Sequence, residues 1–158
     1  MSRIGARLLA LGAVMLLTAT PGRAQEGEEL GLQVTSLLRE HSYYGIGISA
    51  AHRTGGRARI AFGGLYGVAG EEQTVRGEFA GHFMASPARR GGVGLYAIGG
   101  AGFEAGWRNQ GYVILGLGLE SHPGGGSGFH LEAGVGGGFR VSAGWRARWL
   151  GANRSRIP

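Results

Sequence analysis

The sequence predicts an all-β fold, an antiparallel up-and-down transmembrane β-barrel of eight strands. Segments of about ten residues, in which apolar and polar side chains alternate with period two, follow one another from Tyr43 to Trp149, a pattern typical of strands with two unlike faces. These segments match the ~9–11 residues of a tilted membrane strand better than the ~5–6 residues of a soluble strand. Their apolar face carries one ionisable residue, His52 at a strand end, whereas the other face is rich in arginine, glutamate and glycine.

Residues 1–24 have the order of an export signal. Arg3 and Arg7 form a basic start, an apolar run covers residues 8–17, and the small residues Gly22 and Ala24 precede the expected cleavage point. The alternative is an N-terminal membrane helix, but the run has about half of the ~20 residues that a spanning helix needs. Removal of the signal leaves 13 arginines and 10 glutamates, a net charge of +3, which is too small to indicate binding to nucleic acid.

Residues 25–42 form an N-terminal segment in which 30–38 is the candidate first strand. Leu30, Leu32, Val34 and Leu38 fall on one strand face, although Leu30, Val34 and Leu38 also fit the stripe of a helix. We favour the strand, partly because a closed antiparallel barrel usually has an even number of strands.

Seven further strands make up a barrel region over residues 43–149. In the last of them, Phe139, Val141 and Trp145 fall on one face, while Arg140 and Ser142 fall on the other. The connections are short, so neighbouring strands are expected to pair antiparallel as a meander, and residues 150–158 form a C-terminal tail. The seven segments are 43–53, 57–68, 74–85, 92–104, 111–121, 129–136 and 139–149.

The composition indicates which face points outward. A soluble β-protein turns its charged face to water, whereas a membrane barrel turns its apolar face to lipid. Of the 158 residues, 35 are glycine, and many of these lie on the face that also carries arginine and glutamate. A solvated face gains nothing from bare backbone, but a narrow eight-stranded barrel has room for few large side chains inside. A secreted or periplasmic soluble barrel that binds a ligand remains the alternative.

The polar face therefore predicts a charged interior. Buried charges are tolerated when they are paired, and the planar guanidinium of arginine suits a carboxylate partner. We expect Glu104 or Glu78 to reach Arg76 or Arg59, and we expect a structural network of ion pairs that plugs the lumen rather than a path for ions. His82 and His130 lie on the same face. The predicted network consists of Arg57, Arg59, Arg76, Glu78, Glu104, Glu120, Glu132, Arg140, Arg146 and Arg148.

In pattern, residues 28–149 resemble the small eight-stranded outer-membrane barrels of Gram-negative bacteria, the class that includes the transmembrane domain of outer-membrane protein A. Ser142, Gly144, Ala147 and Trp149 fit the C-terminal assembly signal of that class, with Ala147 a weak match. The resemblance implies a monomer surrounded by outer-membrane lipid and recognised by the barrel-assembly machinery. Two departures are the nine residues from Leu150 to Pro158 and the short loops, which leave little room for adhesion.

Catalytic and cofactor chemistry find little support. Residues 134–138 are rich in glycine, but the sequence has no lysine and no phosphate-loop motif, so they are expected to be strand glycines. Ser121 and His122 are the nearest candidates for a lipid-modifying enzyme, but no oriented acid is evident beside them. His82 and His130 are expected to fill the interior rather than to bind metal. We therefore predict no cofactor or metal and a non-enzymatic role, which is either structural or the passage or binding of a small solute or ligand. An outer-membrane lipid-modifying enzyme is kept as a further alternative.

Aromatic residues near strand ends predict girdles at the two membrane interfaces. They are Tyr43, Tyr44, Trp107, Tyr112, Trp145 and Trp149, of which Trp145 fits least well because it lies nearer the middle of its strand.

Overall fold

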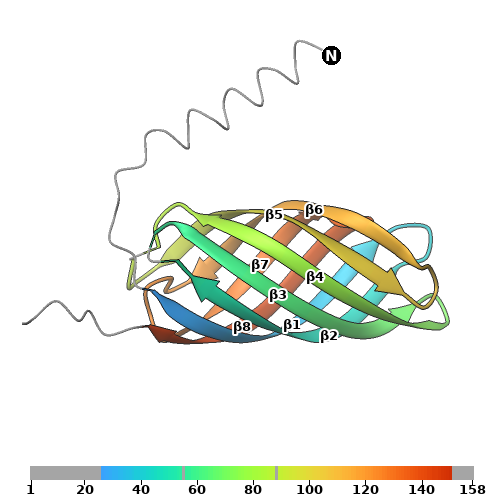
Figure 1. Ribbon diagram of the computed structural model, residues 1–158, viewed down its shortest axis with the longest axis horizontal. Coiled ribbons are helices and arrows are strands. Elements are labelled where there is room, and N and C mark those ends of the chain that lie inside the picture. The colour runs from blue at the N-terminus through green and yellow to red at the C-terminus, as the bar shows by residue number, and fades with distance from the viewer. Residues whose placement is uncertain (1–25, 55, 88, 151–158) are drawn as a thin grey trace, which may run out of the picture.

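A computed structural model describes residues 26–54, 56–87 and 89–150, and these form a closed barrel of eight antiparallel strands (Figure 1). Each strand pairs with the next along the chain, and the last pairs with the first, so the fold is the predicted up-and-down barrel. The described residues contain no helix long and apolar enough to cross a membrane. The strands are β1 (Gly27–Leu38), β2 (Tyr43–Arg53), β3 (Ala58–Ala69), β4 (Glu72–Met84), β5 (Val93–Ala105), β6 (Gln110–Ser121), β7 (Ser127–Val135) and β8 (Phe139–Leu150).

The segment before Tyr43 is a strand and not a helix. β1 begins three residues earlier than expected, at Gly27, and closes the barrel between β2 and β8. Val34, for example, faces Ile46 of β2 and Ala143 of β8. These two ladders give the backbone of β1 hydrogen-bond partners on both edges. A helix at this place would leave the facing backbone groups of β2 and β8 without partners. The predicted export signal and residues 151–158 of the tail lie outside the described residues.

The two faces of the strands point as the glycine and charge pattern predicts. Large apolar side chains cover the outside of all eight strands. Among the described residues, 26 of them are exposed by 38% or more, whereas ten apolar side chains are buried inside. The buried polar side chains of the described residues include all six arginines of the strands and four glutamates. Water-soluble folds show the opposite distribution.

The barrel has two unlike ends. At the terminal end, where β1 begins and β8 finishes, the strands are joined by residues 54–57, 85–92 and 122–126. At the far end the joining turns are 39–42, 70–71, 106–109 and 136–138. Gly70 and Gly137 have φ angles of 64° and 76°, a left-handed backbone that glycine adopts without steric cost.

Candidate functional site

The terminal half of the interior holds a cluster of ion pairs built from five strands. Arg59 of β3 donates to Glu120 of β6 at 2.9 Å and to Glu29 of β1 at 3.2 Å. Arg148 of β8 donates to Glu120 at 3.1 Å, and Arg53 of β2 binds both carboxylates, with 3.3 Å to Glu120. Two carboxylates therefore join three guanidinium groups that come from different walls of the barrel.

The same arginines hold a loop over the terminal end. Arg53 donates to the carbonyl oxygen of Pro123 at 2.7 Å, and Arg148 donates to that of His122 at 3.0 Å. Pro123 is fully buried, and its ring packs against Gly94: a Cβ added to Gly94 would lie 2.8 Å from Cγ of Pro123. Because β2 lies opposite the β6–β7 connection in an eight-stranded ring, these bonds draw the loop across the mouth of the barrel.

The middle of the interior is centred on Glu132 of β7. This carboxylate accepts hydrogen bonds from Tyr96 at 2.7 Å and from Arg140 and Arg146 at 2.9 Å each. The guanidinium group of Arg140 also donates to Glu78 at 3.1 Å, which links this group of residues to the far end. Each lumenal carboxylate is thus shared by several donors, as a charge removed from water requires.

The far end has a second cluster around Glu104 of β5. Arg76 donates to Glu104 at 2.6 Å, and Arg39, from the first far-end turn, binds the same carboxylate through two nitrogens at 2.8 and 3.0 Å. The guanidinium carbon of Arg39 lies 4.9 Å from the ring centre of Trp107, which comes from the 106–109 turn and packs on a buried apolar cluster. Arg39 therefore ties two far-end turns to the interior.

Inward glycines provide seats for tyrosine rings. A Cβ added to Gly118 of β6 would lie 2.2 Å from the ring of Tyr96, so the ring rests on bare backbone. Seating the tyrosine rings is thus a second reason for the inner glycines, in addition to the narrow bore of the barrel. The pairs are Tyr43 with Gly45, Tyr96 with Gly118 and Tyr112 with Gly102. Tyr43 and Tyr112 thus point inward, and their prediction as girdle residues is wrong.

The structure places nine of the ten predicted network residues inside the barrel, while Arg57 lies half-buried just before β3. Arg76 contacts both Glu104 and Glu78, the latter at 3.6 Å, but Arg59 contacts neither. Sequence reasoning left Glu29, Arg53 and Arg39 out of the network. Continuing the alternation of the predicted strand 30–38 by one residue upstream would have placed Glu29 on the inner face, and Arg53 already lay on the polar face of its segment. No pattern pointed to Arg39, because it lies in a turn.

The residues that fit the assembly signal lie on both faces of β8. Ser142 points inward, where its hydroxyl lies 2.6 Å from that of Thr35, and Gly144 packs against the backbone of Leu32. Trp149 points outward and is 58% exposed. The recognition of these residues during assembly stays a prediction.

Little free space remains among the interior side chains. A cavity between Glu29, Glu78, Glu132, Arg140 and Arg146 measures about 30 Å³, which leaves room for no more than a few water molecules. Among the described residues, no three histidine or glutamate side chains gather as a metal site would require.

Two of the candidate chemical residues, His82 and Ser121, form hydrogen bonds within the barrel. His82 accepts from Arg59 through Nδ1, with 3.1 Å to Nε of the arginine, and His130 is buried in the interior. The Ser121 hydroxyl accepts from the backbone N–H of Phe129 at 2.8 Å, and His122 is an exposed loop residue.

A closed eight-stranded antiparallel barrel with an apolar exterior and a charged interior is thus the class that this fold defines. Among solved structures, the chain is similar to the N-terminal β-barrel domain of OprF from Pseudomonas aeruginosa, with a TM-score of 0.56 and 11% identity over 79% of this chain and 100% of that one. It is also similar to the outer membrane protein Ail of Yersinia pestis, with a TM-score of 0.50, 11% identity and the same coverage. At this identity the likeness concerns the fold. No protein-family model and no curated protein matches the sequence.

Proposed function

We propose that the protein is a monomeric, non-enzymatic outer-membrane β-barrel that is embedded in lipid and whose interior is plugged by its own ion pairs. One observation carries the proposal: apolar side chains surround the barrel on all sides while arginine and glutamate fill it. In water this arrangement would expose far more than the few hundred Å² of contiguous apolar surface that soluble monomers tolerate. In a membrane it satisfies both faces. The soluble ligand-binding alternative is accordingly disfavoured.

A structural role rather than passage of solutes follows from the packing of the interior. Glu120 binds guanidinium groups from β2, β3 and β8, and Glu132 binds two guanidinium groups of β8. The interior cavity of about 30 Å³ has no room for a hydrated solute. Pro123 is buried at the terminal end, and Trp107 packs on a buried apolar cluster at the far end. An enzymatic role gains no support, because Ser121 already bonds to backbone and a hydrolytic serine needs a base within hydrogen-bond reach.

Fractionation tests the location. We expect the protein in the outer-membrane fraction, resistant to extraction by concentrated salt without detergent, and migrating on gels as a compact form that heating converts to a slower one. Extraction by salt alone, or recovery from the periplasm, would overturn the proposal.

Planar-bilayer recordings test the plugged interior. We expect the purified barrel to insert without producing conductance steps in concentrated potassium chloride. Reproducible steps would contradict the plug while leaving the membrane location intact.

An assay of lipid hydrolysis tests the enzyme alternative. Loss of lipid hydrolysis on changing His122→Ala would favour the enzyme, whereas a wild-type protein without hydrolytic activity excludes it.

We also propose that the signal at residues 1–24 exports the chain and that the barrel-assembly machinery recognises the end of β8. Trp149 fits the recognition pattern and Trp145 does not, yet both are outward-facing tryptophans of the same strand. The matched variants Trp149→Ala and Trp145→Ala therefore separate recognition from loss of lipid contact. We expect a lower level of compact barrel in cells for Trp149→Ala only; equal levels for the two variants would oppose the proposal.

A further inference from the structure

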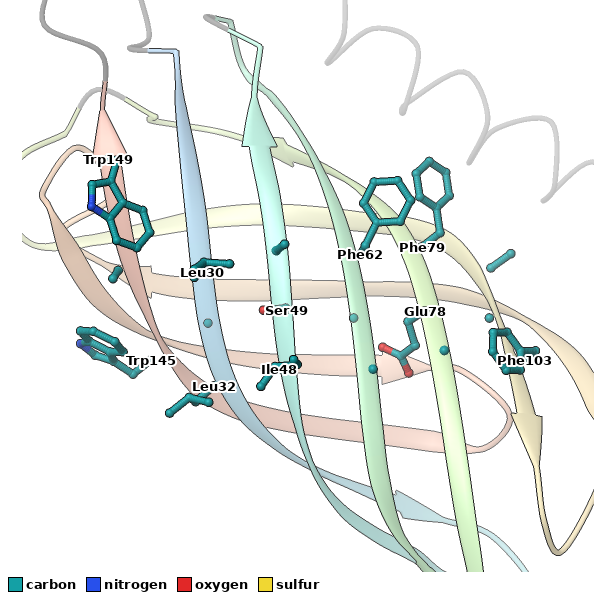
Figure 2. Close-up of a pocket in the computed structure, with 18 residues that line it drawn as sticks. Leu30, Leu32, Ile48, Ser49, Phe62, Glu78, Phe79, Phe103, Trp145 and Trp149 are labelled. Atoms are coloured by element: carbon teal, nitrogen blue, oxygen red, sulfur yellow. The ribbon is translucent and has the colours of Figure 1, made fainter.

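The outer surface of the barrel carries an apolar groove of about 910 Å³ that crosses β8, β1, β2, β3, β4 and β5 (Figure 2). Trp145 and Trp149 stand at one end of the groove, and Phe103 stands at the other. Phe62 and Phe79 lie side by side along it, with ring centres 4.9 Å apart. Its volume is within the range of ~300–1,000 Å³ found for small-ligand pockets.

The floor of the groove is bare backbone. Gly64 of β3 faces Gly77 of β4, so two adjacent outward positions have no side chain. The ring of Phe103 lies over Gly77, but no atom lies within 4 Å of where a Cβ at Gly64 would be. The groove is therefore open at Gly64, between the aromatic side chains that line it.

The groove runs obliquely through the membrane. It follows the ladder from β8 through β1, β2, β3 and β4 to β5, and five spacings of ~4.8 Å give a length of roughly 24 Å. With strands tilted by about 45°, this length spans roughly 17 Å of depth, close to one leaflet of a hydrocarbon core ~30 Å thick. A single extended hydrocarbon chain fits this shape.

Charged residues mark the level at which the groove begins. Glu28 and His52 form a 2.8 Å hydrogen bond on the outward face, between a carboxylate oxygen and Nδ1, with side chains 69% and 52% exposed. They lie two residues from Leu30 and Ala50, which line the groove, and so on the same strand faces. Outward charges avoid the hydrocarbon, so this pair lies at the level of the lipid headgroups at the terminal end.

We propose that the groove binds one acyl chain of a phospholipid from the leaflet at the terminal end, with an ethanolamine headgroup at Glu28 and His52. The carboxylate complements the lipid ammonium, and the imidazole complements the phosphate. The proposal rests on the membrane location proposed above. It commits to lipid rather than to a second copy of the chain because the charged pair complements a zwitterionic headgroup and the length matches one leaflet.

Native mass spectrometry of the detergent-extracted, full-length mature barrel, delipidated and re-supplied with phosphatidylethanolamine, tests this proposal. Gly64→Leu fills the floor, whereas Gly99→Leu places the same side chain on the outward face of β5, outside the groove, where a Cβ also meets no atom within 4 Å. We expect one retained lipid for the wild type and for Gly99→Leu. For Gly64→Leu we expect a lipid occupancy at least about fivefold lower, because the leucine side chain fills the space in which the acyl chain would contact the groove. We further expect Glu28→Gln to remove the preference for phosphatidylethanolamine over phosphatidylcholine, which cannot donate a hydrogen bond from its headgroup.

No retained lipid on the wild type, or equal occupancy in both glycine variants, would overturn the proposal. A dimer that Gly64→Leu abolishes would replace lipid by a second copy as the occupant. Heat-dependent gel migration confirms that each variant is folded, and fractionation of the same proteins reports separately on the membrane location, so failure of one proposal is distinguishable from failure of the other.

Discussion

Replacing Glu120 with glutamine should destabilise the barrel strongly. The Glu120 side chain is 1% exposed, and guanidinium groups surround it: Arg59 at 2.9 Å, Arg148 at 3.1 Å, Arg53 at 3.3 Å and Arg146 at 3.6 Å. Glutamine keeps the shape but removes the negative charge, so these buried cations lose a shared partner. Removal of one partner from a buried ion pair costs about 3–5 kcal/mol.

The assay is urea unfolding of the barrel in phospholipid vesicles, followed by tryptophan fluorescence. With a slope of about 2 kcal/mol/M, the expected loss lowers the midpoint by roughly 2 M. Glu28→Gln is the matched control, because it removes the same charge from an exposed pair and should change the free energy of unfolding by less than about 1 kcal/mol. If both variants unfold within 1 M of each other, the interior network does not stabilise the barrel as argued.

Two further predictions concern packing and orientation. Gly118→Ala should lower the free energy of unfolding by about 1–3 kcal/mol, because the added Cβ would meet the ring of Tyr96. Gly111→Ala should differ little from the wild type, because the nearest atom to its added Cβ lies 3.8 Å away. Equal midpoints of the two variants in urea would show that Tyr96 moves freely. In single-tryptophan variants, lipids brominated on the acyl chain should quench the fluorescence of Trp149 strongly and that of Trp107 weakly. Only Trp149 lies on the lipid-facing surface of a strand. Similar quenching of the two residues would contradict the inside-to-outside orientation of the side chains.

Most of the fold could be predicted from the strand periodicity of the sequence. The outward row of β8, from Phe139 to Trp149, and its inward row, from Arg140 to Arg148, are both visible in the sequence because side chains alternate along any strand. The first strand was ambiguous from its own residues, since Leu30, Val34 and Leu38 satisfy two periods. Its ladders with β2 and β8, which only the closed barrel supplies, settle its structure.

Ion-pair partners were harder to predict, because they depend on contacts across the barrel rather than along a ladder. Arg76 and Glu104 face each other in the β4–β5 register, and that pair was foreseen. Arg59 instead reaches Glu29 and Glu120, two and three strands away, and such reach depends on the tilt of the strands and the width of the bore. Neither quantity can be read from one strand at a time.

The seating of tyrosine rings on glycines has a consequence for how this barrel can change. Each ring fills the volume that its partner glycine leaves vacant, so the two positions act as one unit of shape. A side chain gained at Gly118 and a ring lost at Tyr96 are each disfavoured alone but compatible together. Related barrels should therefore exchange such pairs jointly, and a redesign of this interior should treat the three tyrosine–glycine pairs as its smallest interchangeable parts.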